Sequence, residues 1–255
     1  MELRDKELGL DFEHFRVWLS EETGVARVVI DRAEKLNAFR LDMRRQFAEI
    51  FRRLGEDGRA KVVVVRGSGD RAFSAGGDVG EFLEAGQERM SYLHEDVSAP
   101  EKFPGPVIAA VDGYCFGLGL EVALACDFRI ATSRAVFALP EVRLGMIPGS
   151  GGTQRLVRLI GLTRAKDMVM RGRWVSAQEA FAWGLVTQVV GPEDLDRTAE
   201  TLARELAALP GMALRVAKRV VNLGAELPLC GGLQLEGYAY GMLRGTADYE
   251  EGVRA

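Results

Sequence analysis

Two glutamates in this chain have surroundings that suit acid–base chemistry. Glu121 lies in Gly117-Leu-Gly-Leu-Glu-Val-Ala-Leu-Ala125, which is apolar nearly all round and is therefore predicted to be a buried helix. A buried carboxylate costs free energy unless it is paired, hydrogen-bonded or protonated. Glu141 follows Pro140, which removes a backbone donor and should end a strand with the glutamate at its tip. If the two side chains converge, they can act as a general acid and a general base.

Each glutamate also has a simpler interpretation. Glu121 could merely complement the dipole at the start of its helix. Glu141, taken alone, could be an ordinary solvated residue in a turn. The apolar neighbours of Glu121 favour the catalytic interpretation, because an exposed helix start would not need them.

Glycine-rich loops accompany both glutamates. Residues 67–152 hold 14 of the 30 glycines, which suggests a backbone packed close to a ligand. Ala72-Phe-Ser-Ala-Gly-Gly-Asp78 follows an apolar run, and Gly117 and Gly119 open the helix of Glu121. Free N–H groups at such places are the elements of an oxyanion hole. The first loop could equally be a tight turn before a helix capped by Asp78.

Other chemistries find little support in the sequence. The chain has 2 histidines and 3 cysteines, without zinc spacing or a serine-hydrolase motif. The segment 117–122 imitates a dinucleotide-binding motif but lacks its third glycine. With a net charge of −4 and no basic cluster, nucleic-acid binding is not expected. No apolar run is long enough to span a membrane and no signal peptide is recognisable, so we expect a cytoplasmic protein.

The elements that must position these residues form an α/β pattern. Residues 15–19 and 24–30 alternate as a predicted hairpin, and 61–66 and 107–111 read as strands buried on both faces. Apolar residues from Phe47 to Leu54 have helical spacing, with Gly55 as the expected helix end. The stretch 79–102 is polar and compatible with helix. Ser150 or Thr153 could cap a helix after the glycines at 149–152.

The rest of the chain is predicted to be mostly helical. Helix candidates are 163–170, 176–183, 193–208 and 212–223, with one strand at 185–190. We therefore predict an α/β core over residues 1–190 that binds the substrate, and a helical region over 191–255.

Taken together, these motifs resemble the enoyl-CoA hydratase/isomerase (crotonase) superfamily. The resemblance covers roughly residues 13–255 in order and spacing. The matching segments are Asp31-Arg-Ala-Glu-Lys-Leu-Asn-Ala38, Ala72–Asp78, Gly113–Asp127, Leu139-Pro-Glu141, Gly145-Met-Ile-Pro-Gly-Ser-Gly-Gly-Thr-Gln-Arg-Leu156 and Trp174–Val186. It implies a spiral of repeated ββα units, followed by C-terminal helices that build a trimer or a hexamer and cover the active site.

The resemblance also implies roles for individual residues. It makes Glu121 and Glu141 the catalytic pair, and it makes Gly77 and Leu118 the oxyanion-hole donors. The residues that it places near coenzyme A, the thioester or the catalytic water are Lys35, Leu36, Ala38, Ala75, Gly76, Asp78, Val79, Gly117 and Gly149. The acyl-CoA substrate carries its own coenzyme A, so no separate cofactor and no metal are expected.

The implied reaction is addition of water across the C2=C3 bond of a 2-trans-enoyl-CoA. Glu121 is interpreted as the residue that activates water, and Glu141 as the proton donor. The main alternative is an enoyl-CoA delta isomerase or another acyl-CoA enzyme of the family; isomerases generally need only one carboxylate, so the pair favours a hydratase. The alternatives outside enzymes are an inactive trimeric scaffold and an RNA-binding relative. The intact glutamate pair argues against the scaffold, and the acidic net charge argues against RNA binding.

Overall fold

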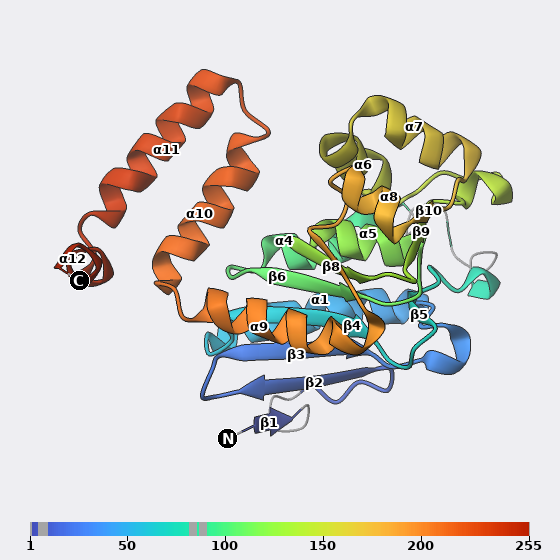
Figure 1. Ribbon diagram of the computed structural model, residues 1–255, viewed down its shortest axis with the longest axis horizontal. Coiled ribbons are helices and arrows are strands. Elements are labelled where there is room, and N and C mark those ends of the chain that lie inside the picture. Colours follow the sequence, from blue (N-terminus) through green and yellow to red (C-terminus); the bar gives the residue numbers. More distant parts are fainter. Residues whose placement is uncertain (1, 5–9, 82–85, 87–90, 255) are drawn as a thin grey trace.

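The computed structural model describes residues 2–4, 10–81, 86 and 91–254, with side chains from residue 10 onward. In this part of the chain the strands form two sheets (Figure 1). The larger sheet has the order β1-β2-β3-β4-β6-β8-β11; it is antiparallel from β1 to β3 and parallel beyond. Its strands are β1 (Glu2–Arg4), β2 (Phe15–Ser20), β3 (Val25–Ile30), β4 (Val62–Gly67), β6 (Val107–Val111), β8 (Phe128–Thr132) and β11 (Gln188–Val190).

The smaller sheet contains the second strand of each repeating unit. Its order is β10-β9-β7-β5, with β5, β7 and β9 parallel. The chain thus passes from β4 to β5, from β6 to β7 and from β8 to β9, and each pair is followed by helices. This arrangement confirms the predicted spiral of ββα units. The strands are β5 (Ala72–Ser74), β7 (Tyr114–Phe116), β9 (Val136–Ala138) and β10 (Val175–Ser176).

Helices surround the two sheets. After β3 comes α1 (Leu41–Asp57), and before β6 come α3 (Leu93–Val97) and α4 (Ala99–Lys102). The remaining α-helices are α5 (Leu118–Ala125), α6 (Gly152–Ile160), α7 (Leu162–Arg171), α8 (Ala177–Ala182), α9 (Leu195–Ala207), α10 (Gly211–Gly224), α11 (Leu229–Leu243) and α12 (Ala247–Arg254). Short 3-10 turns are η1 (Ala33–Lys35), η2 (Val79–Glu81), η3 (Glu141–Leu144) and η4 (Pro192–Asp194).

The central strands are buried on both faces, as their continuous apolar runs predict. In β4, Val63 and Val65 face the main core with α1 and α5, whereas Val62 and Val64 face α9. The same alternation occurs in β6, where Ile108 belongs to the α9 face. Because side chains alternate along a strand, each run fills two cores at once.

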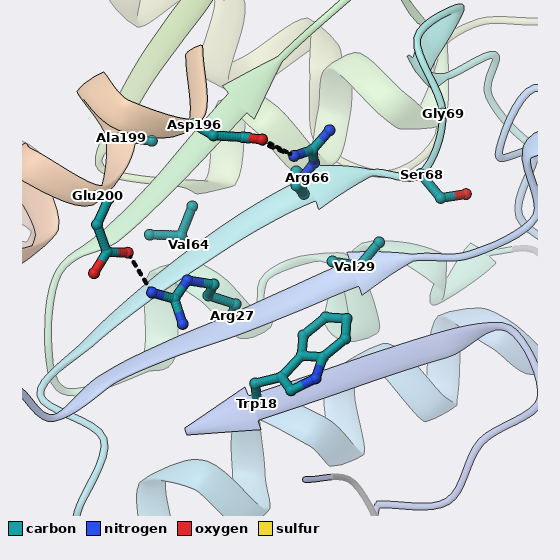
Figure 2. A pocket seen from close by; sticks show the side chains of 10 residues that line it. All are labelled: Trp18, Arg27, Val29, Val64, Arg66, Ser68, Gly69, Asp196, Ala199 and Glu200. Carbon is teal, nitrogen blue, oxygen red and sulfur yellow. Dashed lines mark hydrogen bonds and ion pairs between the residues drawn. The ribbon is translucent and has the colours of Figure 1, made fainter. Parts of the chain in front are cut away.

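Helix α9 is also attached to the sheet by ion pairs (Figure 2). Arg27 on β3 donates to Glu200 over 2.7 Å, and Arg66 on β4 pairs with Asp196. A groove of about 540 Å³ lies beside these pairs, with Trp18 of β2 at its edge. It lies on the α9 face of the sheet, whereas α5, which carries Glu121, packs on the other face.

The C-terminal helices extend beyond the sheets (Figure 1). Lys218 on α10 anchors them: its ammonium lies 2.8 Å from an Asp127 carboxylate oxygen and donates to the carbonyls of Pro100 and Gly105. Along α10–α12 no residue is buried, and large apolar side chains such as Leu229 and Tyr238 are about four-fifths exposed, at 78% and 80%. The division of the chain at residue 190 stays a prediction.

Two local expectations need correction or qualification. Helix α1 does not end at Gly55 but runs to Asp57, and Gly58 ends it with φ 73°, a conformation that favours glycine. The stretch 79–102 contains η2, α3 and α4, but residues 82–85 and 87–90 of it lie outside the described residues. Among the helices described, none is long and apolar enough to cross a membrane.

Candidate active site

A cavity of about 140 Å³ brings both predicted glutamates together with both glycine loops. Its walls come from the loop after β5, the start of α5, η3 and the loop before α6. The predicted site residues that line it are Ala75, Gly76, Gly77, Val79, Gly117, Leu118, Glu121, Glu141 and Gly149. Ala75 and Gly149 are 74 positions apart in the sequence, so distant segments meet in one small space.

Two backbone N–H groups are available at this cavity. A Cβ placed on Gly76 would stand 3.6 Å from the Leu118 nitrogen, so the two glycine loops touch. The amide of Leu118 is the first of α5, and no residue within 10–81 or 91–254 accepts a hydrogen bond from it or from that of Gly77. The flanking Gly76 carbonyl and Asp78 amide are both bonded to Phe39, at 2.8 and 2.7 Å. The loop is therefore held firmly while the Gly77 N–H stays unused.

Glu121 is buried, with 2% of its surface exposed. Its Oε1 accepts from the N–H of Ser150 at 2.7 Å and from that of Gly152 at 2.9 Å. Burial raises the pKa of Glu121, and the two amides and the charges of Arg44 and Arg155 act in the opposite direction. The carboxylate is thus fixed in orientation by the loop before α6.

Glu141 has a different environment. Burial, with a smaller contribution from the charge of Glu121, raises its pKa to about 7. Its Oε2 is enclosed and has no hydrogen-bond partner among the described residues. A carboxyl group with a pKa near 7 can hold a proton and release it at neutral pH, as a general acid must. The two glutamates therefore differ in the way that an acid–base pair requires.

The remaining predicted residues lie next to the cavity but do not line it. They are Lys35, Leu36, Ala38 and Asp78. The carbonyl of Leu36 accepts from the amide of Ala75 at 2.9 Å, which joins this segment to the glycine loop. Leu36 and Asn37 have positive φ values of 52° and 56°, and the buried Asn37 side chain holds the turn by donating to Ser68 and Ala72 carbonyls.

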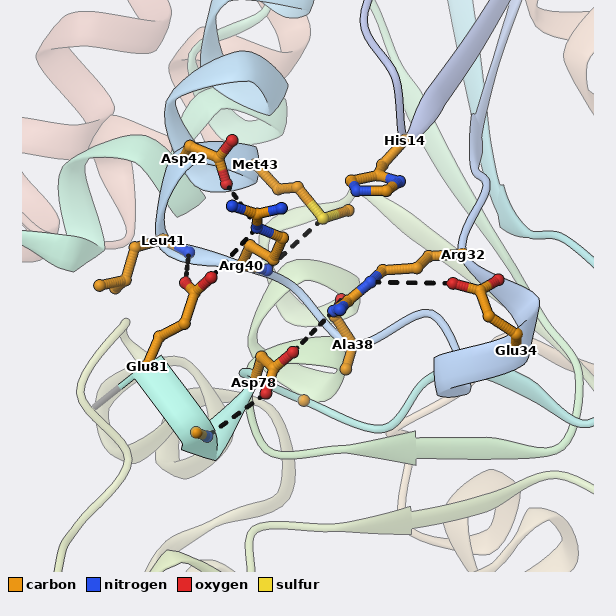
Figure 3. Close-up of polar contacts among 12 residues, drawn as sticks. His14, Arg32, Glu34, Ala38, Arg40, Leu41, Asp42, Met43, Asp78 and Glu81 are labelled. Atoms are coloured by element: carbon orange, nitrogen blue, oxygen red, sulfur yellow. Dashed lines mark hydrogen bonds and ion pairs between the residues drawn. The ribbon is translucent and has the colours of Figure 1, made fainter. Parts of the chain in front are cut away.

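The Asp78 carboxylate is engaged by the protein (Figure 3). It accepts from Arg32 at 2.8 Å, and Arg32 also donates to the carbonyl of Ala38. Glu81 makes a parallel link by accepting from Arg40 at 3.1 Å and from the first amide of α1, on Leu41, at 2.7 Å. Both pairs tie the loop of Gly77 to the segment before α1. Asp78 therefore supports the site rather than presenting a free carboxylate to it.

The structure adds residues that the sequence analysis did not select. Arg44 and Ser150 line the cavity, and Leu93, Pro140, Leu144, Met146 and Ile147 complete its wall. Arg44 could have been found, because it lies three residues before Phe47 and seven before Phe51, on the buried side of α1. Ser150 does not cap α6, and neither does Thr153; the N-cap is Gly151, without a side-chain bond.

This arrangement has a definite chemical capacity. Two unused N–H groups can stabilise negative charge on a carbonyl oxygen. One carboxylate is oriented by backbone amides, and a second can exchange a proton near neutral pH. Within the described residues, no group of three or more potential metal ligands occurs. The site is suited to moving protons next to a carbonyl that becomes an enolate.

Comparison with known proteins agrees with this chemistry. The model of the enoyl-CoA hydratase/isomerase family matches residues 20–255. A short-chain-enoyl-CoA hydratase of Clostridium acetobutylicum is 35% identical over 243 residues, which are 94% of this chain and 93% of that protein. A crotonyl-CoA hydratase of Syntrophomonas wolfei is 36% identical over 248 residues, 93% of each.

The fold has solved counterparts too. The crystal structure of an enoyl-CoA hydratase from Bacillus anthracis superposes with a TM-score of 0.89 at 36% identity, covering 95% of both chains. The chain therefore belongs to the enoyl-CoA hydratase/isomerase family, whose crotonase fold it has.

Proposed function

We propose that this chain is an enoyl-CoA hydratase, which adds water to the C2=C3 bond of a 2-trans-enoyl-CoA and forms a 3-hydroxyacyl-CoA. The observation that carries the proposal is the single cavity lined by both glutamates and by both unused amides. The family model and the hydratases among its relatives support the same reaction class.

In the proposed reaction, the thioester carbonyl accepts hydrogen bonds from the N–H groups of Gly77 and Leu118. These donors stabilise the enolate oxygen as water attacks C3. Glu121 takes the proton from the attacking water, and Glu141 gives a proton to C2. The amides of Ser150 and Gly152, which hold Oε1 of Glu121, fix the direction of its carboxylate.

The segment of Lys35, Leu36 and Ala38 lies beside the glycine loop, outside the cavity. We therefore assign it to the coenzyme A part of the substrate.

The first test is spectrophotometric. With crotonyl-CoA, the enoyl-thioester absorbance is expected to fall, and Glu121→Gln and Glu141→Gln are each expected to cut turnover by about 10²-fold or more. Each variant keeps the size of the side chain, so circular dichroism should match that of the wild type. Near-wild-type turnover in either variant would contradict the two-carboxylate mechanism.

A second substrate distinguishes a hydratase from an isomerase. A 3-enoyl-CoA is expected to react slowly or not at all, and its products are identified by chromatography. Rapid conversion to the 2-enoyl isomer, without hydration of crotonyl-CoA, would assign the chain to the isomerases of the family instead.

Assembly, location and cofactor use complete the proposal. The exposed apolar side chains of α10–α12 support a homotrimer or hexamer, testable by light scattering. Three free cysteines, of which Cys230 is exposed, support a reducing, cytoplasmic environment. We also propose that no added metal or cofactor is needed, because the reacting groups all belong to the chain; dialysis against EDTA should leave turnover unchanged.

A further inference from the structure

Arg44 is a buried cation at the wall of the cavity. It comes from the first turn of α1, and only 4% of its surface is exposed. Its Nη1 donates to the hydroxyl of Ser150 at 3.1 Å, although the two residues are 106 positions apart in the chain. Its Nε is enclosed and has no hydrogen-bond partner among the described residues.

Ser150 connects this arginine to Glu121. The hydroxyl of Ser150 accepts from Arg44, while its backbone N–H donates to Oε1 of Glu121 at 2.7 Å. Ser150 is itself buried, with 1% exposed, so neither bond competes with bulk water. The guanidinium, the serine and the carboxylate therefore form one continuous polar chain from α1 to α5.

The charged groups that act on Arg44 are side chains of the protein, so its positive charge in turn acts on protein groups. Burial lowers the pKa of Arg44, and Glu121, Asp96 and Glu81 oppose that effect. Of these, Glu81 is already bonded to Arg40 and to the start of α1. The negative charges that act on Arg44 therefore belong to the protein itself.

The positive charge of Arg44 affects the pKa values of Glu121 and Glu141 unequally. The positive charge of Arg44, together with that of Arg155 on α6, lowers the pKa of Glu121 against the effect of burial. The groups that shift the pKa of Glu141 include Glu121 but not Arg44. Removing the arginine should therefore affect one carboxylate of the pair and leave the other nearly unchanged.

We propose that Arg44 is a positioning residue, which acts through Ser150 and through its charge to keep Glu121 oriented and ionised as the base. This inference rests on the proposed hydratase function. It accounts for a buried arginine on the apolar side of α1, where burial of an unpaired charge would otherwise be costly. It also assigns the water-activating role to Glu121 on grounds that do not involve Glu141.

The test compares pH profiles of kcat for crotonyl-CoA hydration. In Arg44→Met, the acid limb is expected to move to higher pH by about one unit or more, because an opposite charge close to a carboxylate lowers its pKa by about that amount. The alkaline limb should stay in place, and kcat should fall more than KM changes. Arg44→Lys restores the charge and should return the acid limb toward the wild-type position.

Two further variants sharpen the comparison. Arg45→Met removes the same charge from the next position of α1, where the side chain is exposed, and should leave the profile unchanged. Ser150→Ala removes the hydroxyl but keeps the amide that holds Glu121; it should shift the acid limb in the same direction by a smaller amount. If Arg44→Met does not fold, Arg44→Lys and Ser150→Ala still carry the test.

The outcomes are distinct. An acid limb that stays in place in folded Arg44→Met, or a Ser150→Ala profile equal to wild type, overturns the inference. So does a loss confined to KM for an enoyl thioester with a second carboxylate, which would make Arg44 a substrate-binding residue. If wild type does not hydrate crotonyl-CoA, or if Glu121→Gln retains turnover, the proposed function fails instead.

Discussion

Oε1 of Glu141 lies 3.0 Å from the point where a Cβ atom on Gly117 would stand. Gly117 precedes α5 with φ 50° and ψ −123°, a backbone conformation that side-chain-bearing residues rarely adopt. The residue that starts the helix of one glutamate thus borders the carboxylate of the other. Glycine is required here because the Cβ of any side chain would come within 3.0 Å of the Glu141 carboxylate.

Gly117→Ala should accordingly damage catalysis more than stability. The added methyl group must displace Glu141 or turn the Leu118 N–H, and a misplacement of about 1 Å can cost about 10²-fold in rate. The positive φ adds about 1–2 kcal/mol of strain. We expect kcat for crotonyl-CoA to fall by about 10²-fold, with a folded protein by circular dichroism.

Gly58→Ala is the matched control for that variant. Gly58 also has a positive φ, of 73°, but a Cβ there would meet nothing within 4 Å. Backbone strain should lower the unfolding midpoint of Gly58→Ala, whereas its kcat should stay at the wild-type value. If Gly117→Ala also keeps wild-type kcat, the close approach to Glu141 has no catalytic role.

The pKa of Glu141 predicts the alkaline side of the activity profile. Glu141 donates a proton only when it is protonated, and its pKa is about 7. The kcat/KM for crotonyl-CoA should therefore decline as pH rises above about 7, because kcat/KM reports groups of the free enzyme. In Glu141→Gln the residual activity should lack this decline. A wild-type kcat/KM that is constant from pH 6 to 9 would contradict the assignment of Glu141 as the acid.

The carboxyl group of Glu141 also makes the free energy of unfolding depend on pH. A pKa raised from 4.5 to about 7 means that the folded protein binds this proton more tightly than the unfolded chain. The stability that this proton contributes is fully present below about pH 4.5 and is lost as pH rises through about 7. At about pH 7 the loss amounts to about 3 kcal/mol of the free energy of unfolding. Glu141→Gln removes this loss, so it should be more stable than wild type at pH 8 and little different at pH 4.5.

Urea unfolding at the two pH values, at one protomer concentration, measures this difference. The gain in the free energy of unfolding should appear together with the loss of turnover, since a carboxyl group whose burial destabilises the folded state is useful only to the reaction. An equal effect of the substitution at both pH values would show that the carboxyl group does not titrate as inferred.

The segment before α1 yields a prediction about substrate binding. Lys35 is exposed and lies outside the cavity, whereas Asp78 is bonded to Arg32 and supports the loop of Gly77. Lys35→Ala should raise KM for crotonyl-CoA and leave kcat nearly unchanged, because only the proposed contact with coenzyme A is lost. With crotonyl-pantetheine, which lacks the nucleotide, the same variant should behave as wild type.

Asp78→Ala should lower kcat rather than raise KM, which is the opposite of the result expected for Lys35→Ala. Loss of its bond to Arg32 loosens the loop that presents the Gly77 N–H, so kcat should fall with both thioesters. Steady-state kinetics with the two substrates separates the two roles. If Asp78→Ala changes only KM, and only with the coenzyme A thioester, then Asp78 is a binding residue rather than a support.

Local errors in the sequence analysis have physical causes. Gly55 was the predicted end of α1, but only Gly58 has the left-handed backbone that ends the helix, and backbone angles cannot be read from residue type. Strand β8 escaped prediction because Arg129 interrupts its apolar pattern. That arginine is nonetheless buried, since carbonyls of Ala123, Cys126 and Leu185 accept its hydrogen bonds.

The sequence was sufficient to predict the central buried strands and to single out two glutamates as candidates for catalysis. Buried runs such as 62–65 must fill two cores, and an apolar helix around Glu121 must be buried, because these consequences follow from hydrophobic periodicity alone. Its motifs also indicated the family and the two glutamates. These inferences needed only neighbours along the chain.

The difference between the two glutamates depends on the tertiary fold. Glu121 accepts two amide hydrogen bonds from residues 29 and 31 positions away, whereas Oε2 of Glu141 has no partner among the described residues. This difference depends on how separate ββα units stack. The same stacking brings Arg44 to Ser150. Desolvation and electrostatic coupling depend on distance in space, so the proposed division into base and acid rests on the folded chain.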